Sequence, residues 1–287
     1  MISIRTYAII FSVIFLIFSC KKETKSTEVT TNPVIDSITN PTNRVILSSE
    51  INWQKLNPAR GDQSPQAGTI WGDRNGTEAT GFLAKFADGF SSPPHIHNVT
   101  YRAVVIEGLI HNDDPDAESM WMKPGSFWTQ PQGESHITAS KGESIALVEI
   151  DHGPYLVKPI DEAFDNGERP INIDVSNVVW QNMETSNLID KTSNAEVSFL
   201  WQSEKANGYF VKFPKGYNAK IVSDGSVFHS VVIQGKLQYI LPQNGDKKTL
   251  DQGSYFGATA KAVHTLSTIS DNEVILYIRT NGNFQIM

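Results

Sequence analysis

Three histidines are the residues of this sequence best suited to chemistry. His95 and His97 are two residues apart, Tyr101 follows four residues later, and His136 lies beyond an intervening segment. Residues two apart in a β-strand point to the same face, so His95, His97 and Tyr101 share one side of the sheet. His136 on a neighbouring strand can join them, and neutral imidazole is a good ligand for Zn, Fe, Cu and Ni. The spacing therefore predicts a three-histidine metal site. The alternative is three barrel-lining histidines with satisfied hydrogen bonds.

Tyr101 is the candidate catalytic residue, and the sequence leaves three roles open for it. It could be a fourth ligand as phenolate, a hydrogen-bond donor to a metal-bound ligand, or an apolar filler. Three neutral histidines would leave a divalent ion with a local charge near +2, which favours an anionic small-molecule ligand. Fe(II) and Zn(II) are the favoured ions, because Fe(II) in such a set supports oxygen chemistry and Zn(II) activates water. Glu134 and Trp128 have positions from which they could line the same pocket. Capping a surface turn is the favoured role for Glu134, and filling the core explains Trp128 equally well.

Short strands separated by turn residues must position these side chains. Turn dipeptides such as Asn75-Gly76 and Pro124-Gly125 divide apolar, β-branched runs, and only residues 160–164 suggest a helical turn. Many short strands with closely spaced turns indicate an all-β sandwich or barrel. The predicted strands of the first half are Val45–Trp53, Gly68–Gly72, Thr80–Phe86, Thr100–Ile110, Ser119–Met122, Ser126–Thr129, His136–Ala139 and Ser144–Ile150.

The sequence contains an internal duplication. Six pairs of residues recur at separations of 127 or 128: Trp53/Trp180, Phe86/Phe213, Gly89/Gly216, Gly108/Gly235, Gly125/Gly253 and His136/His264. A single recurrence predicts two tandem domains rather than a solenoid.

The second unit has lost the metal-binding set. The positions of His95, His97 and Tyr101 are taken by Val222, Asp224 and Phe228, and only His264 remains. One imidazole, of His264, and one carboxylate, of Asp224, are too few ligands for a transition-metal site. We expect a structural or interfacial domain, in which His229 faces outward; a polar pocket built on Asp224 and His264 is the alternative.

Two stretches resemble the cupin motifs. The first runs from Gly89 through the His-x-His pair to Gly108, and the second from Gly125 to His136 and Ser140. The sequence is similar to bicupins of the RmlC-like superfamily, and specifically to the ChrR-type anti-sigma-factor cupins. Tyr101 stands where the family usually has Glu, and Ser140 where it often has Asn.

This resemblance implies a fold and two functions. The fold is all-β, with two tandem cupin (double-stranded β-helix, or jelly-roll) barrels. One function is a metal-dependent enzyme, such as the three-histidine cupin dioxygenases, that uses His95, His97 and His136. The other is a non-catalytic sensor module that binds a metal or a ligand.

The N-terminus resembles a bacterial lipoprotein signal. Residues 1–20 combine Arg5, a short apolar run and Leu-Ile-Phe-Ser before Cys20, the predicted lipidation site. We expect residues 21–44 to form a flexible tether, 45–150 the metal-binding barrel, 151–174 a linker and 175–287 the degenerate barrel. Lys21 after the cysteine is typical of lipoproteins sent to the outer membrane, so we expect a lipid-anchored protein of the bacterial cell envelope.

Net charge and cysteine content limit the possible binding partners and disulfide bonds. The formal net charge is −7, which argues against nucleic acid, because phosphate binding needs a basic surface. Cys20 is the only cysteine, so an intramolecular disulfide cannot form. The expected partners are a small molecule and a membrane, and a homodimer is left open.

Overall fold

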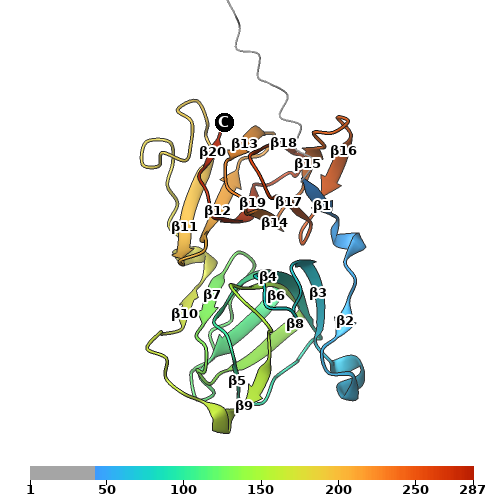
Figure 1. Cartoon of the computed structure of the whole chain (residues 1–287), viewed down its shortest axis with the longest axis vertical. Helices are drawn as coiled ribbons and strands as arrows, with labels where there is room; N and C mark the ends of the chain where they lie inside the picture. The colour runs from blue at the N-terminus through green and yellow to red at the C-terminus, as the bar shows by residue number, and fades with distance from the viewer. Residues whose placement is uncertain (1–42) are drawn as a thin grey trace, which may run out of the picture. The chain divides into compact units, whose positions relative to one another are not determined.

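The computed structural model describes residues 43–287, which belong to one compact unit (Figure 1). Strands dominate this unit, and only short 3-10 turns interrupt them, so the predicted all-β class is confirmed. The turns are η1 (Ser48–Glu50), η2 (Pro58–Gln63), η3 (Ile160–Glu162) and η4 (Val175–Asn177). Between residues 43 and 287 no helix is long and apolar enough to cross a membrane. Cys20, the predicted signal segment and residues 21–42 of the predicted tether lie outside the described residues.

The first barrel is built on a seven-stranded antiparallel sheet. Its strands, in spatial order, are β10 (Ile171–Ile173), β7 (Phe127–Gln130), β6 (Tyr101–Asp113), β8 (Ile137–Ile150), β4 (Thr80–Phe86), β3 (Gln66–Trp71) and β2 (Gln54–Lys55). A separate pair, β5 (His95–His97) with β9 (Val157–Pro159), carries the two closely spaced histidines.

Two long strands bend to serve both layers of this barrel. The β6–β8 register shifts on both sides of Glu107, next to Gly108, whose φ is +71°. Bulges of this kind bend a strand and increase its twist. Beyond the bend, Leu109–Asp113 pairs with Ile137–Lys141. The predicted strands 136–139 and 144–150 are therefore one bent strand, and the predicted strand 119–122 is reduced to a single bridge between Met122 and Ile110.

The second barrel consists of two antiparallel sheets. One has the order β1 (Arg44–Ile46), β17 (Tyr255–Ala258), β14 (Phe228–Gln234), β19 (Val274–Thr280), β12 (Asn207–Phe213) and β11 (Glu196–Gln202). The other has the order β16 (Lys247–Leu250), β15 (Leu237–Ile240), β18 (Ala262–Thr268), β13 (Asn218–Ser223) and β20 (Phe284–Ile286). The structure thus contains two tandem jelly-roll barrels, as predicted.

The internal repeat is visible in the backbone. Gly108 and its counterpart Gly235 have φ of +71° and +82°, and Gly89 and Gly216 have φ of +69° and +70°. L-residues with side chains rarely adopt this conformation. Matched glycines therefore make the same turns in both barrels.

The two barrels pack face to face through a shared apolar layer. On β6, Ala103 and Val105 point into the first barrel, whereas Val104 and Ile106 point toward the second. Side chains of the second barrel, including Trp201, join the same interface cluster. Strands buried on both faces explain why the sequence shows continuous apolar runs instead of alternation.

Both segments that flank the first barrel differ from their predicted roles. β1, expected at the start of the first barrel, pairs with β17 of the second, because Arg44–Ile46 supplies hydrogen bonds to an otherwise open sheet edge. The predicted linker 151–174 is also not a simple connection. Its strands β9 and β10 pair with β5 and β7, and so form part of the wall of the first barrel.

Candidate metal centre

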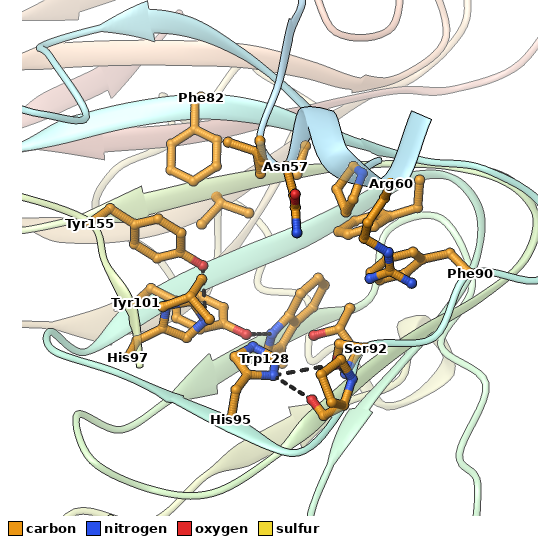
Figure 2. A pocket seen from close by; sticks show the side chains of 18 residues that line it. Asn57, Arg60, Phe82, Phe90, Ser92, His95, His97, Tyr101, Trp128 and Tyr155 are labelled. Atoms are coloured by element: carbon orange, nitrogen blue, oxygen red, sulfur yellow. Dashed lines mark hydrogen bonds between the residues drawn. The ribbon is translucent and has the colours of Figure 1, made fainter. Parts of the chain in front are cut away.

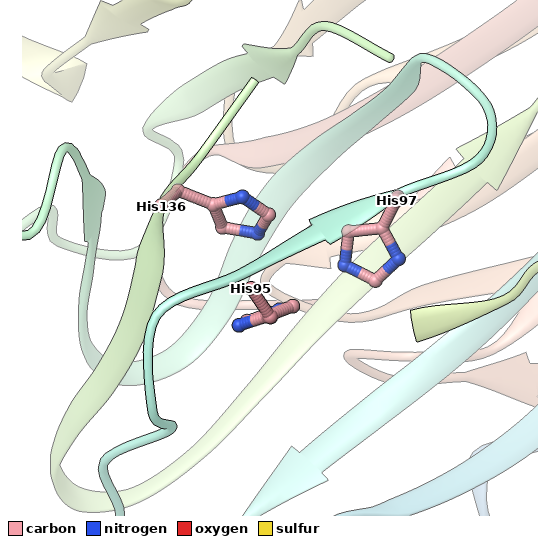
Figure 3. Close-up of side chains that lie close together, drawn as sticks. All are labelled: His95, His97 and His136. Atoms are coloured by element: carbon pink, nitrogen blue, oxygen red, sulfur yellow. The ribbon is translucent and has the colours of Figure 1, made fainter. Parts of the chain in front are cut away.

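The three predicted histidines converge inside the first barrel (Figure 3). Reciprocal backbone hydrogen bonds of 3.0 Å join His95 on β5 to His136 immediately before β8. His97, two residues along β5, points to the same side. One nitrogen from each ring lies within 4.8 Å of the others, and all three side chains are buried. Local strand pairing alone therefore brings together residues that are 41 positions apart in the sequence.

Backbone carbonyls orient all three rings. The Nδ1 atoms of His95, His97 and His136 hydrogen-bond to the carbonyl oxygens of Pro93 at 2.9 Å, Leu156 at 3.2 Å and Glu134 at 3.2 Å. A carbonyl accepts, so each Nδ1 carries the proton and each Nε2 has a lone pair. Partners of this kind fix the tautomer of metal-ligating histidines.

The histidines are also uncharged at neutral pH. Burial, followed by the neighbouring imidazole of His95, lowers the pKa of His136 to about 3. Burial, followed by His136 and His95, lowers the pKa of His97 well below its usual value, and burial lowers that of His95. Metal ions bind the neutral imidazole. Protonation state, tautomer and convergence all fit a divalent transition metal.

Tyr101 lies beside the histidines but is held by other groups. Its hydroxyl donates to Asn112 Oδ1 at 2.9 Å, accepts from Trp128 Nε1 at 3.4 Å, and lies 3.4 Å from His136 Nε2. Burial raises the pKa of the phenol, which disfavours a phenolate ligand. The packing favours a hydrogen-bonding role in the barrel wall.

Tyr155 is a site residue that the sequence reading did not single out. Its ring stacks on His97 with centroids 4.4 Å apart, and its hydroxyl lies 3.2 Å from His97 Nε2. Tyr155 comes from the segment predicted as a linker, and no motif spacing connects it to the histidines. Its signal in the sequence was only an aromatic residue directly after the Gly153-Pro154 turn.

An apolar cavity of about 540 Å³ opens beside His95 and His97 (Figure 2). Aromatic and aliphatic side chains form most of its wall, and two polar residues, Asn57 and Arg60, line the side away from the histidines. Principal wall residues are Phe82, Phe86, Phe90, Trp128, Val148 and Tyr155. Trp128 therefore serves both as core and as pocket lining. Glu134 contributes its carbonyl, not its carboxylate, to the site.

The corresponding place in the second barrel is filled. His264 is fully buried, stacks on Phe228 and hydrogen-bonds to Tyr239 at 2.8 Å. Asp224 is exposed and accepts from the backbone of Asn283, so the alternative polar pocket with His264 does not form. Within residues 43–287, His95, His97 and His136 are the one group of three or more potential ligands. His229 faces out of its barrel, as predicted, and stacks on Trp71 in the interface.

Sequence comparison places this fold in a family. A family model described as a domain of unknown function (DUF4437) matches residues 44–287. The chain belongs to this family. No curated protein matches the sequence.

Solved structures share the fold at low identity. A proposed dioxygenase from Nostoc punctiforme is 12% identical, with a TM-score of 0.65 over 84% of this chain and 83% of that one. A formate complex of Lactobacillus farciminis oxalate decarboxylase is 10% identical, with a TM-score of 0.56 over 86% and 88%. Bacillus subtilis oxalate decarboxylase, which has Mn(II) centres, is 12% identical, with a TM-score of 0.53 over 85% and 78%. These are cupin-type proteins, and the likeness shows that this chain has a cupin fold.

Proposed function

We propose that this protein is a metal-dependent cupin enzyme that acts on a small, largely apolar molecule, with His95, His97 and His136 as the metal ligands. One observation carries the proposal. Three neutral, buried imidazoles each offer a ring nitrogen within 4.8 Å of the others, and two of them line a cavity large enough for an organic ligand.

The cavity favours a catalytic over a structural metal. Structural zinc sites are closed by four protein ligands, whereas catalytic sites use about three and keep a position open. His95 and His97 line the cavity, so an open position would face it. When bound, Fe(II) would supply oxygen chemistry, and Zn(II) would supply a Lewis acid.

The protein's own residues would orient the ligand and exclude water. The hydroxyl of Tyr155 lies on the ligand side of His97 and can donate a hydrogen bond to an oxygen held there. Aromatic walls replace water around the reacting group. Oxalate, a small dianion without apolar surface, would leave these walls without contacts, which favours an oxygenase over an oxalate decarboxylase.

Metal analysis of the purified protein, combined with oxygen uptake, tests this proposal. We expect about one transition-metal ion per chain in the wild type and at least a tenfold lower content in His136→Ala. His264→Ala is the control, because this histidine occupies the matching position in the second barrel and should leave the metal content unchanged. An absence of metal from the wild type, or equal loss in both variants, would refute the assignment.

The second candidate is a metal-binding sensor of the ChrR type, supported by the motif similarity of the sequence. Tightly bound zinc without turnover of any diketone or thiol would favour the sensor. Iron with substrate-dependent oxygen uptake would favour the enzyme.

Membrane tethering is a further part of the proposal, supported by the N-terminal sequence. A protein lipidated at Cys20 would place the cavity close to the bacterial outer membrane. Mass spectrometry of the mature N-terminal peptide decides this point, since an unmodified Cys20 or an intact residue 1–20 segment would exclude the anchor.

A further inference from the structure

The charges around the cavity are unbalanced. Among the described residues that line it, Arg60 is the only one with a permanent charge, and no Asp or Glu is present. At the other end, a divalent ion bound by the three neutral histidines, as in the proposed function, would add positive charge. The cavity therefore attracts anions and offers no acidic group to a cation.

Arg60 and Asn57 form a small donor cluster on the side of the cavity away from the histidines (Figure 2). The guanidinium lies 4.9 Å from the Phe90 ring centroid and donates to the carbonyl of Ser91 at 3.3 Å. No carboxylate of residues 43–287 forms an ion pair with it. Asp62, the acid of the same segment, pairs with Lys55 at 3.1 Å.

Asn57 adds a neutral donor beside the guanidinium. Its side-chain oxygen caps the η2 segment by accepting from the backbone N–H of Ala59 at 3.2 Å. This bond commits the oxygen and turns the Nδ2 group toward the cavity, as Figure 2 shows. Both residues are exposed, and a planar guanidinium and an amide N–H group on the same side of a cavity can each donate to a carboxylate.

We propose that the pocket binds an amphipathic organic anion. Its carboxylate contacts Arg60 and Asn57, and its aromatic or branched aliphatic body lies along Phe82, Phe86 and Phe90. An oxygen group at its other end reaches the histidines. The last contact rests on the proposed function, whereas the carboxylate site stands on the donor cluster alone.

Calorimetric titration of chelator-treated, full-length protein tests the carboxylate site without any metal. The probes are phenylbutyrate and phenylbutyramide, which match in shape and differ in charge. A charged hydrogen-bonding partner should give phenylbutyrate about tenfold or more tighter binding than the amide. Arg60→Gln should reduce the two affinities to within about twofold of each other, and Arg60→Lys should retain part of the preference.

Lys55→Gln is the matched control, because it removes one positive charge from the same segment without lining the cavity. It should leave the preference for phenylbutyrate unchanged. The proposal is overturned if neither probe binds, if Arg60→Gln keeps the preference, or if the preference occurs only after metal is restored. The last result would place the anion on the metal. Metal content, measured separately, reports on the histidine site, so the two proposals fail independently.

Discussion

Tyr101 shows how the fold accommodates a single residue that differs from the usual cupin motif. The ring stands where the cupin motif usually has Glu, and its hydroxyl belongs to a chain of hydrogen bonds with Asn112 and Trp128. Asn112 Oδ1 also accepts from Thr138 Oγ1 at 2.7 Å. This network ties β6, β7 and β8 together behind the histidines. The phenol stabilises the wall of the candidate site and, because burial raises its pKa, adds no charge to it.

Tyr101→Phe should lower the free energy of unfolding by about 1–2 kcal/mol, because Trp128 Nε1 loses its buried acceptor. The metal content should remain that of the wild type. Urea denaturation and elemental analysis measure the two effects. Tyr209→Phe is the control, since this half-buried hydroxyl makes no hydrogen bond within the described part of the chain, and it should change stability by less than about 0.5 kcal/mol. Loss of metal from Tyr101→Phe would instead identify the phenol as a ligand.

At the scale of elements, β1 connects the two barrels. Arg44–Ile46 extends a sheet of the second barrel, where Val45 packs against the core, and the chain then runs to β2 at the edge of the first barrel's sheet. Ile46, the next residue, packs in the layer between the barrels. A few residues thus contact both barrels and cover an open edge of β17.

Val45→Asp should destabilise the protein by about 2–3 kcal/mol, because a carboxylate would enter the apolar edge of the second barrel's core. Thermal unfolding followed by circular dichroism measures the change. Ser49→Asp adds the same charge to an exposed position of the same segment and should have an effect below about 0.5 kcal/mol. Equal effects of both substitutions would show that β1 contributes no packing energy.

At the scale of the whole molecule, buried charges link the barrels. Arg279 of the second barrel contacts Glu149 at 3.0 Å and Asp151 at 2.7 Å, and Arg102 contacts Asp151 at 3.1 Å. The Arg102 guanidinium lies 3.8 Å from the centroid of the Trp201 ring. Burial raises the pKa of Glu149, although both arginines act to lower it. Buried charges are costly when they lose their partners. These ion pairs therefore favour a single relative placement of the two barrels over a sliding apolar contact.

Arg279→Met should cost about 3–5 kcal/mol, because Glu149 would remain buried without its nearest cation. The double variant Arg279→Met/Glu149→Leu should recover a large part of that loss, since the unpaired charge is removed. Guanidinium denaturation of the two single variants and the double variant gives the coupling energy. Arg169→Met, at an exposed ion pair with Asp165, should cost less than about 1 kcal/mol. Additive losses from Arg279 and Glu149 would mean that the pair is not coupled.

Features that depend on local pattern were readable from the sequence. Period-2 alternation predicts that His95 and His97 share a face, as they do on β5, whereas Tyr101, expected to continue that alternation, lies on the next strand, β6. Turn glycines such as Gly108 and Gly235 mark the repeat. The meeting of His136 with the other histidines spans 41 positions and was expected from the spacing of the cupin motifs. The all-β class, the two barrels and the loss of the second metal set follow from local pattern and from the internal repeat. Each of these requires only strand geometry and the identity of the residue at a matched position.

Features that depend on contacts between distant segments required the folded chain. Tyr155, Arg60 and Asn57 reach the cavity from segments that carry no motif, and β1 pairs with a strand more than 200 residues away. Backbone hydrogen bonds at a sheet edge can be satisfied by any extended segment, so the sequence does not specify which one supplies them. The pocket's charge balance depends on the same long-range packing, because an arginine becomes a ligand-binding group only where no acidic side chain folds against it.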